Sequence, residues 1–115
     1  MKVIFINVND QTVSPVEIEN DLHAIYDKIG CRLVQLVGYR DELIVCDEEA
    51  RLKPWEHGFA LGAWRICSNA LILSEDKDGN FADTKLTAED VAKEIRFFGK
   101  EEPLPEPAIR VIAFC

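Results

Sequence analysis

The segment at residues 2–8 most constrains the fold, because it is apolar on both faces of a strand. Val3 and Phe5 point to one side of such a strand, while Ile4 and Ile6 point to the other. A strand with two apolar faces belongs inside a sheet and not at its edge. We therefore expect this strand in the interior of the principal sheet.

Four further segments predict strands, since β-branched, aromatic and other apolar residues there are separated by turn residues. These segments are residues 12–18, 31–38, 42–47 and 69–74. Pro15 has no amide hydrogen for a strand ladder, which places residues 12–18 at a sheet edge or at a bulge. Residues 59–65 predict a short helix or turn, limited in length by the neighbouring glycines.

Two segments predict helices, because their apolar residues fall on one stripe at helical spacing. Residues 20–29 begin at Asn20, a favourable capping residue, and end at Gly30. Residues 87–98 begin with a capping box at Thr87. Together with the strands, these helices predict an α+β fold, in which two main helices pack on a mostly antiparallel sheet.

A length of 115 residues predicts a single domain. We expect the α+β domain to cover residues 1–99 and a proline-rich, extended connector to cover residues 100–107. Residues 108–115 form an apolar, β-prone run that must be buried. The run predicts a strand that docks on the sheet of its own domain or on that of a second copy, and the homodimer is the favoured arrangement.

Charge and cysteine usage narrow the setting of the protein. The net charge of −8 repels phosphate backbones, so broad nucleic-acid binding is disfavoured. No C-x-x-C pair occurs, so we expect free thiols in a reducing compartment. Neither a signal peptide nor a membrane span is evident, and the expected location is the cytoplasm, without membrane partners. No cofactor is predicted.

The candidate ligand-binding residues gather in the stretch at residues 46–73. Cationic and indole side chains occur there within fifteen residues, at Arg51, Lys53, Trp55, His57, Trp64 and Arg65. Asn69, at the start of the next strand, completes the set. Indole faces stack on bases, and guanidinium groups bind carboxylate or phosphate, so the set predicts binding of a nucleotide or another anion. The alternative is that both tryptophans belong to the core and that the charges are solvated.

An acidic rim opens the same stretch at Asp47, Glu48 and Glu49. No second acidic cluster completes a coordination shell, so no metal is predicted. Cys46 or Cys67 with His57 would supply a nucleophile and a base, yet nothing in the sequence orients them. No catalytic residue is assigned, and a thiol or hydrolytic enzyme stays an alternative.

Three short motifs carry a resemblance to a known family. Residues 47–53 read D-E-E-A-R-L-K, residues 69–73 read N-A-L-I-L before an acidic turn, and residues 86–90 read L-T-A-E-D. In these residues the chain resembles a family of small bacterial, phage and plasmid proteins of unknown function, number 3846 in the unknown-function series. The resemblance covers roughly residues 1–98.

Two departures from the family pattern affect the candidate site. Ala50 stands where the family has a glycine, and residues 54–57 (P-W-E-H) replace a segment that begins Pro-Asn. No binding role is therefore carried over from that asparagine.

The resemblance implies a mobile-element setting and no established activity. We expect a non-enzymatic accessory protein that binds a host or defence component, in the host cytoplasm if it is phage-encoded. The alternatives are a binder of a small anion, an acidic DNA mimic that counters restriction, and the thiol or hydrolytic enzyme. Lysines interspersed among the acidic residues weaken the DNA-mimic alternative.

Overall fold

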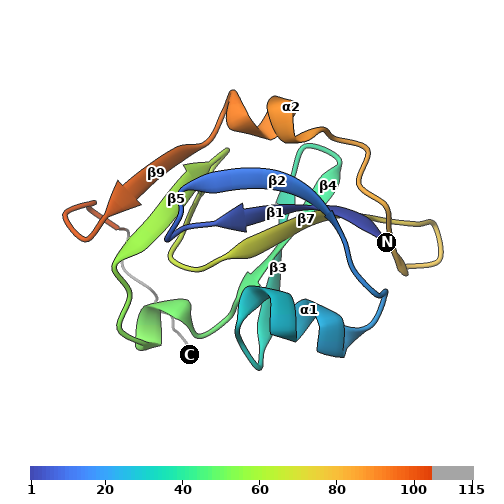
Figure 1. Ribbon diagram of the computed structural model, residues 1–115, viewed down its shortest axis with the longest axis horizontal. Coiled ribbons are helices and arrows are strands. Elements are labelled where there is room, and N and C mark those ends of the chain that lie inside the picture. Colours follow the sequence, from blue (N-terminus) through green and yellow to red (C-terminus); the bar gives the residue numbers. More distant parts are fainter. Residues whose placement is uncertain (105–115) are drawn as a thin grey trace, which may run out of the picture.

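The computed structural model describes residues 1–104, and this part of the chain is built mainly from strands (Figure 1). The strands are β1 (Lys2–Asn7), β2 (Thr12–Glu17), β3 (Val34–Tyr39), β4 (Glu42–Asp47), β5 (His57–Leu61), β6 (Trp64–Ile66), β7 (Ala70–Glu75), β8 (Phe81–Ala82) and β9 (Arg96–Gly99). The helical elements are α1 (Leu22–Ile29), α2 (Ala88–Ala92) and a 3-10 turn, η1 (Ala50–Leu52). The predicted α+β fold with two main helices is wrong, because both helices are short and the described part is mostly β.

The strands form two antiparallel sheets. The larger sheet has the order β2–β1–β7–β4–β3, and β8 adds to the end of β7. The smaller sheet has the order β6–β5–β9. Strand β1 lies between β2 and β7, which confirms the interior position predicted from its two apolar faces. Strand β2 lies at an edge, as Pro15 predicted.

The two faces of the larger sheet are covered by different elements. One face packs against α1, and its buried residues are Val3, Ile25, Ile29, Val45, Leu71 and Leu73. The other face packs against the smaller sheet, and the buried residues there include Ile4, Ile6, Ile44, Ile72, Phe59 and Leu61. Each of these aliphatic or aromatic side chains contributes roughly 1.5–3 kcal/mol by leaving water. Covering both faces explains why residues 3–6 of β1 and residues 70–73 of β7 are apolar on both sides of the sheet.

The first predicted helix is confirmed with a shifted start. Its cap is Asp21 and not Asn20, because the Asp21 carboxylate accepts a hydrogen bond from the Ala24 N–H at 2.8 Å. Gly30 ends α1 in the left-handed conformation, with φ of 85°, as predicted.

The second predicted helix, at residues 87–98, is wrong in its C-terminal half. The capping box of Thr87 starts α2, but this helix ends at Ala92 and the chain becomes strand β9. Phe97 and Phe98 are good β-formers, and β9 completes the smaller sheet by pairing with β5. Tertiary pairing therefore overrides a helical spacing of apolar residues.

The short helix or turn predicted at residues 59–65 is instead a hairpin between β5 and β6. Gly62 adopts a positive φ of 59° in the two-residue turn that joins them. Such tight hairpin turns require residues that tolerate this conformation, and glycine does so without a steric penalty.

A buried carboxylate ties the β3–β4 hairpin to the segment before α2. Glu42 is 5% exposed and accepts hydrogen bonds from the hydroxyl groups of Ser74 and Thr84. The Lys85 N–H donates a third bond to Glu42 at 3.1 Å. Three donors compensate for the cost of burying this carboxylate.

The homodimer predicted through residues 108–115 falls outside the described residues and stays a prediction. Deleting residues 108–115 is expected to convert a dimer into a monomer, because the deletion removes the apolar run that would pair between copies. Light scattering coupled to size exclusion checks this expectation. A full-length chain that elutes as a monomer would contradict it.

Candidate functional site

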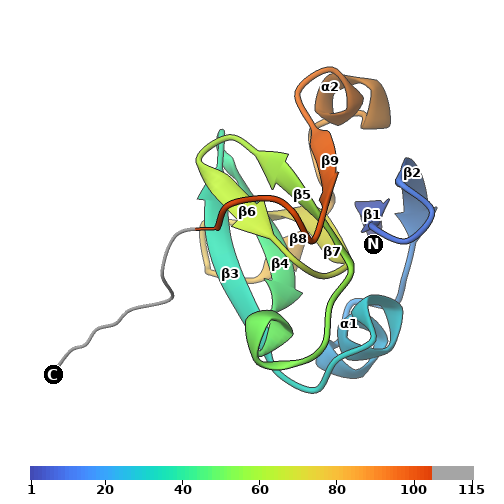
Figure 2. The ribbon, with the colours of Figure 1, turned by 90° about the vertical axis from the view of Figure 1, so that its left-hand side faces the viewer.

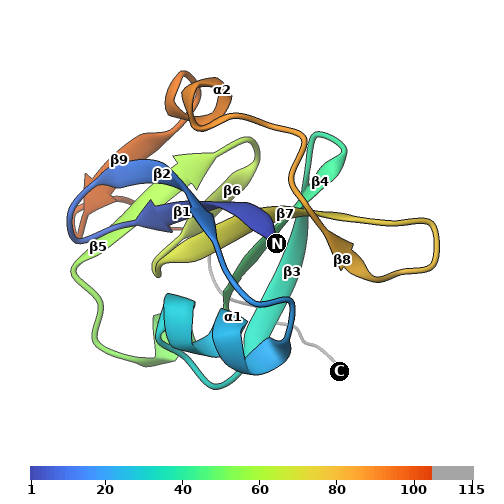
Figure 3. The same cartoon turned by 45° about the vertical axis from the view of Figure 1, so that its right-hand side comes forward.

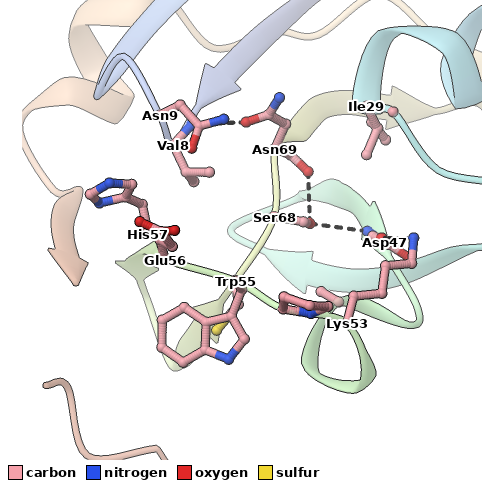
Figure 4. A pocket seen from close by; sticks show the side chains of 14 residues that line it. Val8, Asn9, Ile29, Asp47, Lys53, Trp55, Glu56, His57, Ser68 and Asn69 are labelled. Atoms are coloured by element: carbon pink, nitrogen blue, oxygen red, sulfur yellow. Dashed lines mark hydrogen bonds and ion pairs between the residues drawn. The ribbon is translucent and has the colours of Figure 1, made fainter. Parts of the chain in front are cut away.

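One cavity brings together four of the seven predicted ligand-binding residues (Figure 4). It encloses about 510 Å³ where the end of β1, the segment between η1 and β5, and the start of β7 meet. The predicted residues in its lining are Lys53, Trp55, His57 and Asn69. Asp47, from the predicted acidic rim, also lines it.

Lys53 is held at the cavity by Asp47. The Lys53 Nζ donates to Asp47 Oδ2 at 2.8 Å, and the other carboxylate oxygen of Asp47 accepts from the Glu49 N–H at 2.8 Å. The Asp47 side chain is almost fully buried, while that of Lys53 is 43% exposed. The hydrogen bond to Asp47 raises the pKa of the Lys53 ammonium. The ammonium therefore stays charged, and its remaining hydrogens are available to a ligand.

Asn69 is fixed in orientation by the end of β1. Its side-chain oxygen accepts a hydrogen bond from the Val8 N–H at 2.9 Å, and its backbone oxygen accepts from Ser68 Oγ at 2.9 Å (Figure 4). The Val8 N–H needs an acceptor, which determines which way the amide lies. Among the described residues, none accepts a hydrogen bond from the Asn69 amide nitrogen. Two N–H donors of Asn69 are thus free for a ligand.

Trp55 and His57 provide the aromatic part of the lining. Trp55 is half-buried, and its ring meets Phe98 edge to face, with ring centroids 6.1 Å apart at 84°. Lys100 Nζ lies 5.9 Å from the centroid of the Trp55 ring. His57 opens β5 and pairs with Gly99 of β9. Trp55 therefore packs against Phe98 and also lines the cavity. The prediction that it binds a ligand is compatible with the alternative that it belongs to the core.

The other predicted binding residues lie elsewhere. Arg51, Arg65 and Glu48 line a second hollow of about 410 Å³ on the other side of η1. Trp64, 40% exposed, donates from its indole N–H to the Gly38 carbonyl at 2.8 Å and so joins β6 to the edge of β3. The predicted binding residues between Arg51 and Arg65 are therefore divided between these two hollows, and Trp64 lines neither of them.

The predicted acidic rim does not act as one group. Asp47 pairs with Lys53, while Glu49 pairs with Arg32 at 3.2 Å. Glu48 is exposed and lines only the second hollow. Residues 1–104 contain no cluster of three or more histidine, cysteine, aspartate or glutamate side chains suited to a metal ion.

The thiols near the site are free and poorly suited to nucleophilic attack. Burial raises the pKa of Cys46 to about 12 and that of Cys67 to about 11. Nucleophilic cysteines need a lowered pKa, since the thiolate is the reactive form. Cys31 is also free, and burial raises its pKa. These thiols pack as small apolar side chains.

Comparison with known families follows the resemblance seen in the short motifs. The model of a family described as a domain of unknown function, DUF3846, matches residues 1–98. The chain belongs to this family. No curated protein and no solved structure matches the chain.

The DUF3846 match contains every residue that lines the cavity, and it ends within β9. No helix in residues 1–104 of this DUF3846 protein is long and apolar enough to cross a membrane.

Some lining residues of the cavity escaped the sequence-based prediction. Asn9, Glu56 and Ser68 reach it beside the predicted residues. Ser68 carries no signal in the sequence except its position next to Asn69. The register of β1 against β7, which pairs Ile6 with Ala70, brings these distant segments together.

Proposed function

We propose that this DUF3846 protein is a non-enzymatic binding protein, and that its cavity takes a small anionic ligand with a flat ring. The observation that carries the proposal is the presence of two anchored donors, the Lys53 ammonium and the Asn69 amide, in one cavity with an indole. Charge-assisted hydrogen bonds from such donors favour carboxylate or phosphate, and the indole favours a planar group. A nucleotide combines both features.

The size and pre-organisation of the cavity support this proposal. Its volume of about 510 Å³ lies within the roughly 300–1,000 Å³ that is typical of small-molecule sites. Lys53 and Asn69 are held by Asp47 and Val8 before any ligand arrives. Less ordering entropy is then lost on binding, which favours affinity.

Two observations weigh against the alternative functions. The raised pKa values of Cys46 and Cys67 disfavour a thiol nucleophile at neutral pH. A DNA mimic needs unpaired carboxylates, whereas Glu94 pairs with Arg40, and Glu102 pairs with both Arg65 and Arg96. The accessory role in a phage or mobile element stays part of the proposal, with the cavity binding a host-derived small molecule.

The cavity is tested by a thermal-shift screen of nucleotides and cyclic nucleotides on the full chain. A ligand present at a hundred times its Kd adds about 2.7 kcal/mol to the free energy of unfolding. The screen is expected to yield at least one nucleotide that raises the melting temperature. A panel without any stabilising nucleotide contradicts the proposal.

The Asn69→Asp substitution tests the site at one atom. The variant keeps an oxygen that accepts from the Val8 N–H but replaces the free N–H₂ group with a carboxylate oxygen. We expect the affinity for the stabilising nucleotide to fall at least about tenfold, because a donor becomes a negative charge facing an anion. Isothermal titration calorimetry measures the change.

The matched control is Lys77→Ala, in the exposed turn between β7 and β8 that extends from the body of the molecule (Figure 3). The variant also lowers the net charge by one but lies outside the cavity. It should bind like the wild type. Equal affinities of the Asn69→Asp and Lys77→Ala variants would show that the nucleotide binds elsewhere.

A further inference from the structure

The chain continues past the DUF3846 match into a short segment that crosses the smaller sheet. Residues 99–104, here called the clasp, begin at the last residue of β9 and pass in front of β6 (Figure 2, red). The Glu102 N–H donates to the Gly99 carbonyl at 3.1 Å, which turns the chain back over the sheet. The family match ends just before this turn.

Glu102 fastens the clasp to both edge strands of the smaller sheet. Its Oε2 accepts from Arg65 Nε of β6 at 2.8 Å and from Arg96 Nη2 of β9 at 2.7 Å. Its Oε1 accepts from Arg96 Nη1 at 3.1 Å, so the pairing with Arg96 is bidentate. The Glu102 side chain is only 11% exposed. These arginines lower the pKa of Glu102 to about 2, so the carboxylate is charged in neutral solution.

The clasp also supports the aromatic lining of the cavity. Lys100 places its ammonium against the Trp55 ring, and His57 pairs with Gly99. Leu104 packs against the same small cluster as Trp55, which consists of Ala50, Cys67 and Phe98. Trp55 and His57, the two aromatic residues of the cavity, therefore both contact or pair with residues that lie after the family match.

We propose that Glu102 is a positioning residue for the ligand cavity, and that by fastening the clasp across β6 and β9 it fixes the Trp55 ring. The effect of Glu102 on ligand affinity rests on the proposed function. Its effect on the position of Trp55 does not, because that position is measured without a ligand. The domain at residues 1–98 supplies the polar donors, and the clasp determines how closely the indole meets a flat ring. The clasp is thus a determinant of ligand preference in this chain.

The test uses the full chain with Trp64→Phe, which leaves Trp55 as the sole tryptophan. Acrylamide quenching and the emission maximum of Trp55 are compared for the parent, Glu102→Gln and Leu104→Ala. Both variants are expected to raise the quenching constant about twofold and to shift emission to the red, because the indole gains access to water. The melting temperature of Glu102→Gln should change little, since ion pairs whose arginine partners are this exposed contribute little to stability.

Glu101→Gln is the matched control, because it removes the same charge from the neighbouring exposed residue. This variant should leave quenching unchanged. Unaltered quenching in Glu102→Gln would overturn the proposal, even if Leu104→Ala, which removes a side chain packed in the same cluster as Trp55, raises it.

The link to the cavity is measured with adenosine monophosphate as the probe. The affinity of Glu102→Gln should be about fivefold lower than that of Glu101→Gln, whereas a merely structural ion pair would leave the two equal. Equal, measurable affinities would overturn the link. If the nucleotide panel, adenosine monophosphate included, fails to bind the parent chain, the proposed function fails, while quenching still decides whether Glu102 positions Trp55.

Discussion

Replacing Phe59 with alanine should lower the free energy of unfolding by about 3–5 kcal/mol, the typical cost of truncating a fully buried aromatic ring. Phe59 is fully buried in β5, where the smaller sheet packs on the larger one. Its removal leaves a cavity between two layers that are held by hydrogen-bonded pairs and cannot collapse easily. Urea denaturation followed by circular dichroism measures the loss.

Phe97→Ala is the control for the Phe59 variant. Phe97 is directly paired with Phe59 but only half-buried. The same chemical truncation should therefore cost less there. If the two variants lost equal stability, the position of Phe59 between the sheets would be wrong.

Replacing Gly58 with alanine should destabilise the protein by roughly 1–3 kcal/mol, because the added methyl group overpacks the smaller sheet. A Cβ atom at Gly58 would lie 2.6 Å from the Ile66 carbonyl oxygen and 2.6 Å from two ring atoms of Phe98. The Ile66 carbonyl belongs to the backbone of β6, so relieving the contact must disturb the hairpin. Phe98 supports Trp55, so we also expect greater quenching of Trp55.

Gly38→Ala is the matched control for Gly58→Ala. A Cβ atom at Gly38 meets no atom within 4 Å, and this glycine also lies in a strand. Its stability should change by less than about 0.5 kcal/mol. A Gly58→Ala variant as stable as Gly38→Ala would contradict the close approach of β5, β6 and β9.

Local patterns in the sequence predicted the larger sheet well. The two apolar faces of β1 and the proline in β2 placed an interior and an edge strand, and both positions are confirmed. The smaller sheet was missed because β5, β6 and β9 are short, and glycines lie in β5, in β9 and in the turn between β5 and β6. The spacing of Ile95 and Phe98 fits one face of a helix, yet Phe98 is buried through strand pairing with β5. A helix and a strand are both compatible with this local spacing, and only pairing with β5 decides that the segment forms a strand.

Residue types predicted five of the residues that line the candidate cavity, but not which of the predicted residues share it. Lys53 and Trp55 were identified from charge and aromatic character within one stretch. The same criterion selected Arg65, which the β5–β6 hairpin carries to the second hollow and to Glu102. Which residues share a cavity depends on strand register between distant segments, and a single sequence contains no local signal for it.

The strand order of the larger sheet has a consequence for how the chain emerges during synthesis. Strand β1 leaves the ribosome first, and β2 follows at once, but the inner partner of β1 is β7 (Ala70–Glu75). The chain must therefore be translated to about Glu75, roughly three-quarters of residues 1–98, before both edges of β1 are paired. Until then β1 has one unpaired edge, and its exposed backbone hydrogen-bonding groups and apolar side chains favour aggregation. Completion of β7 closes the sheet at its centre, so folding is expected to occur late and in one step.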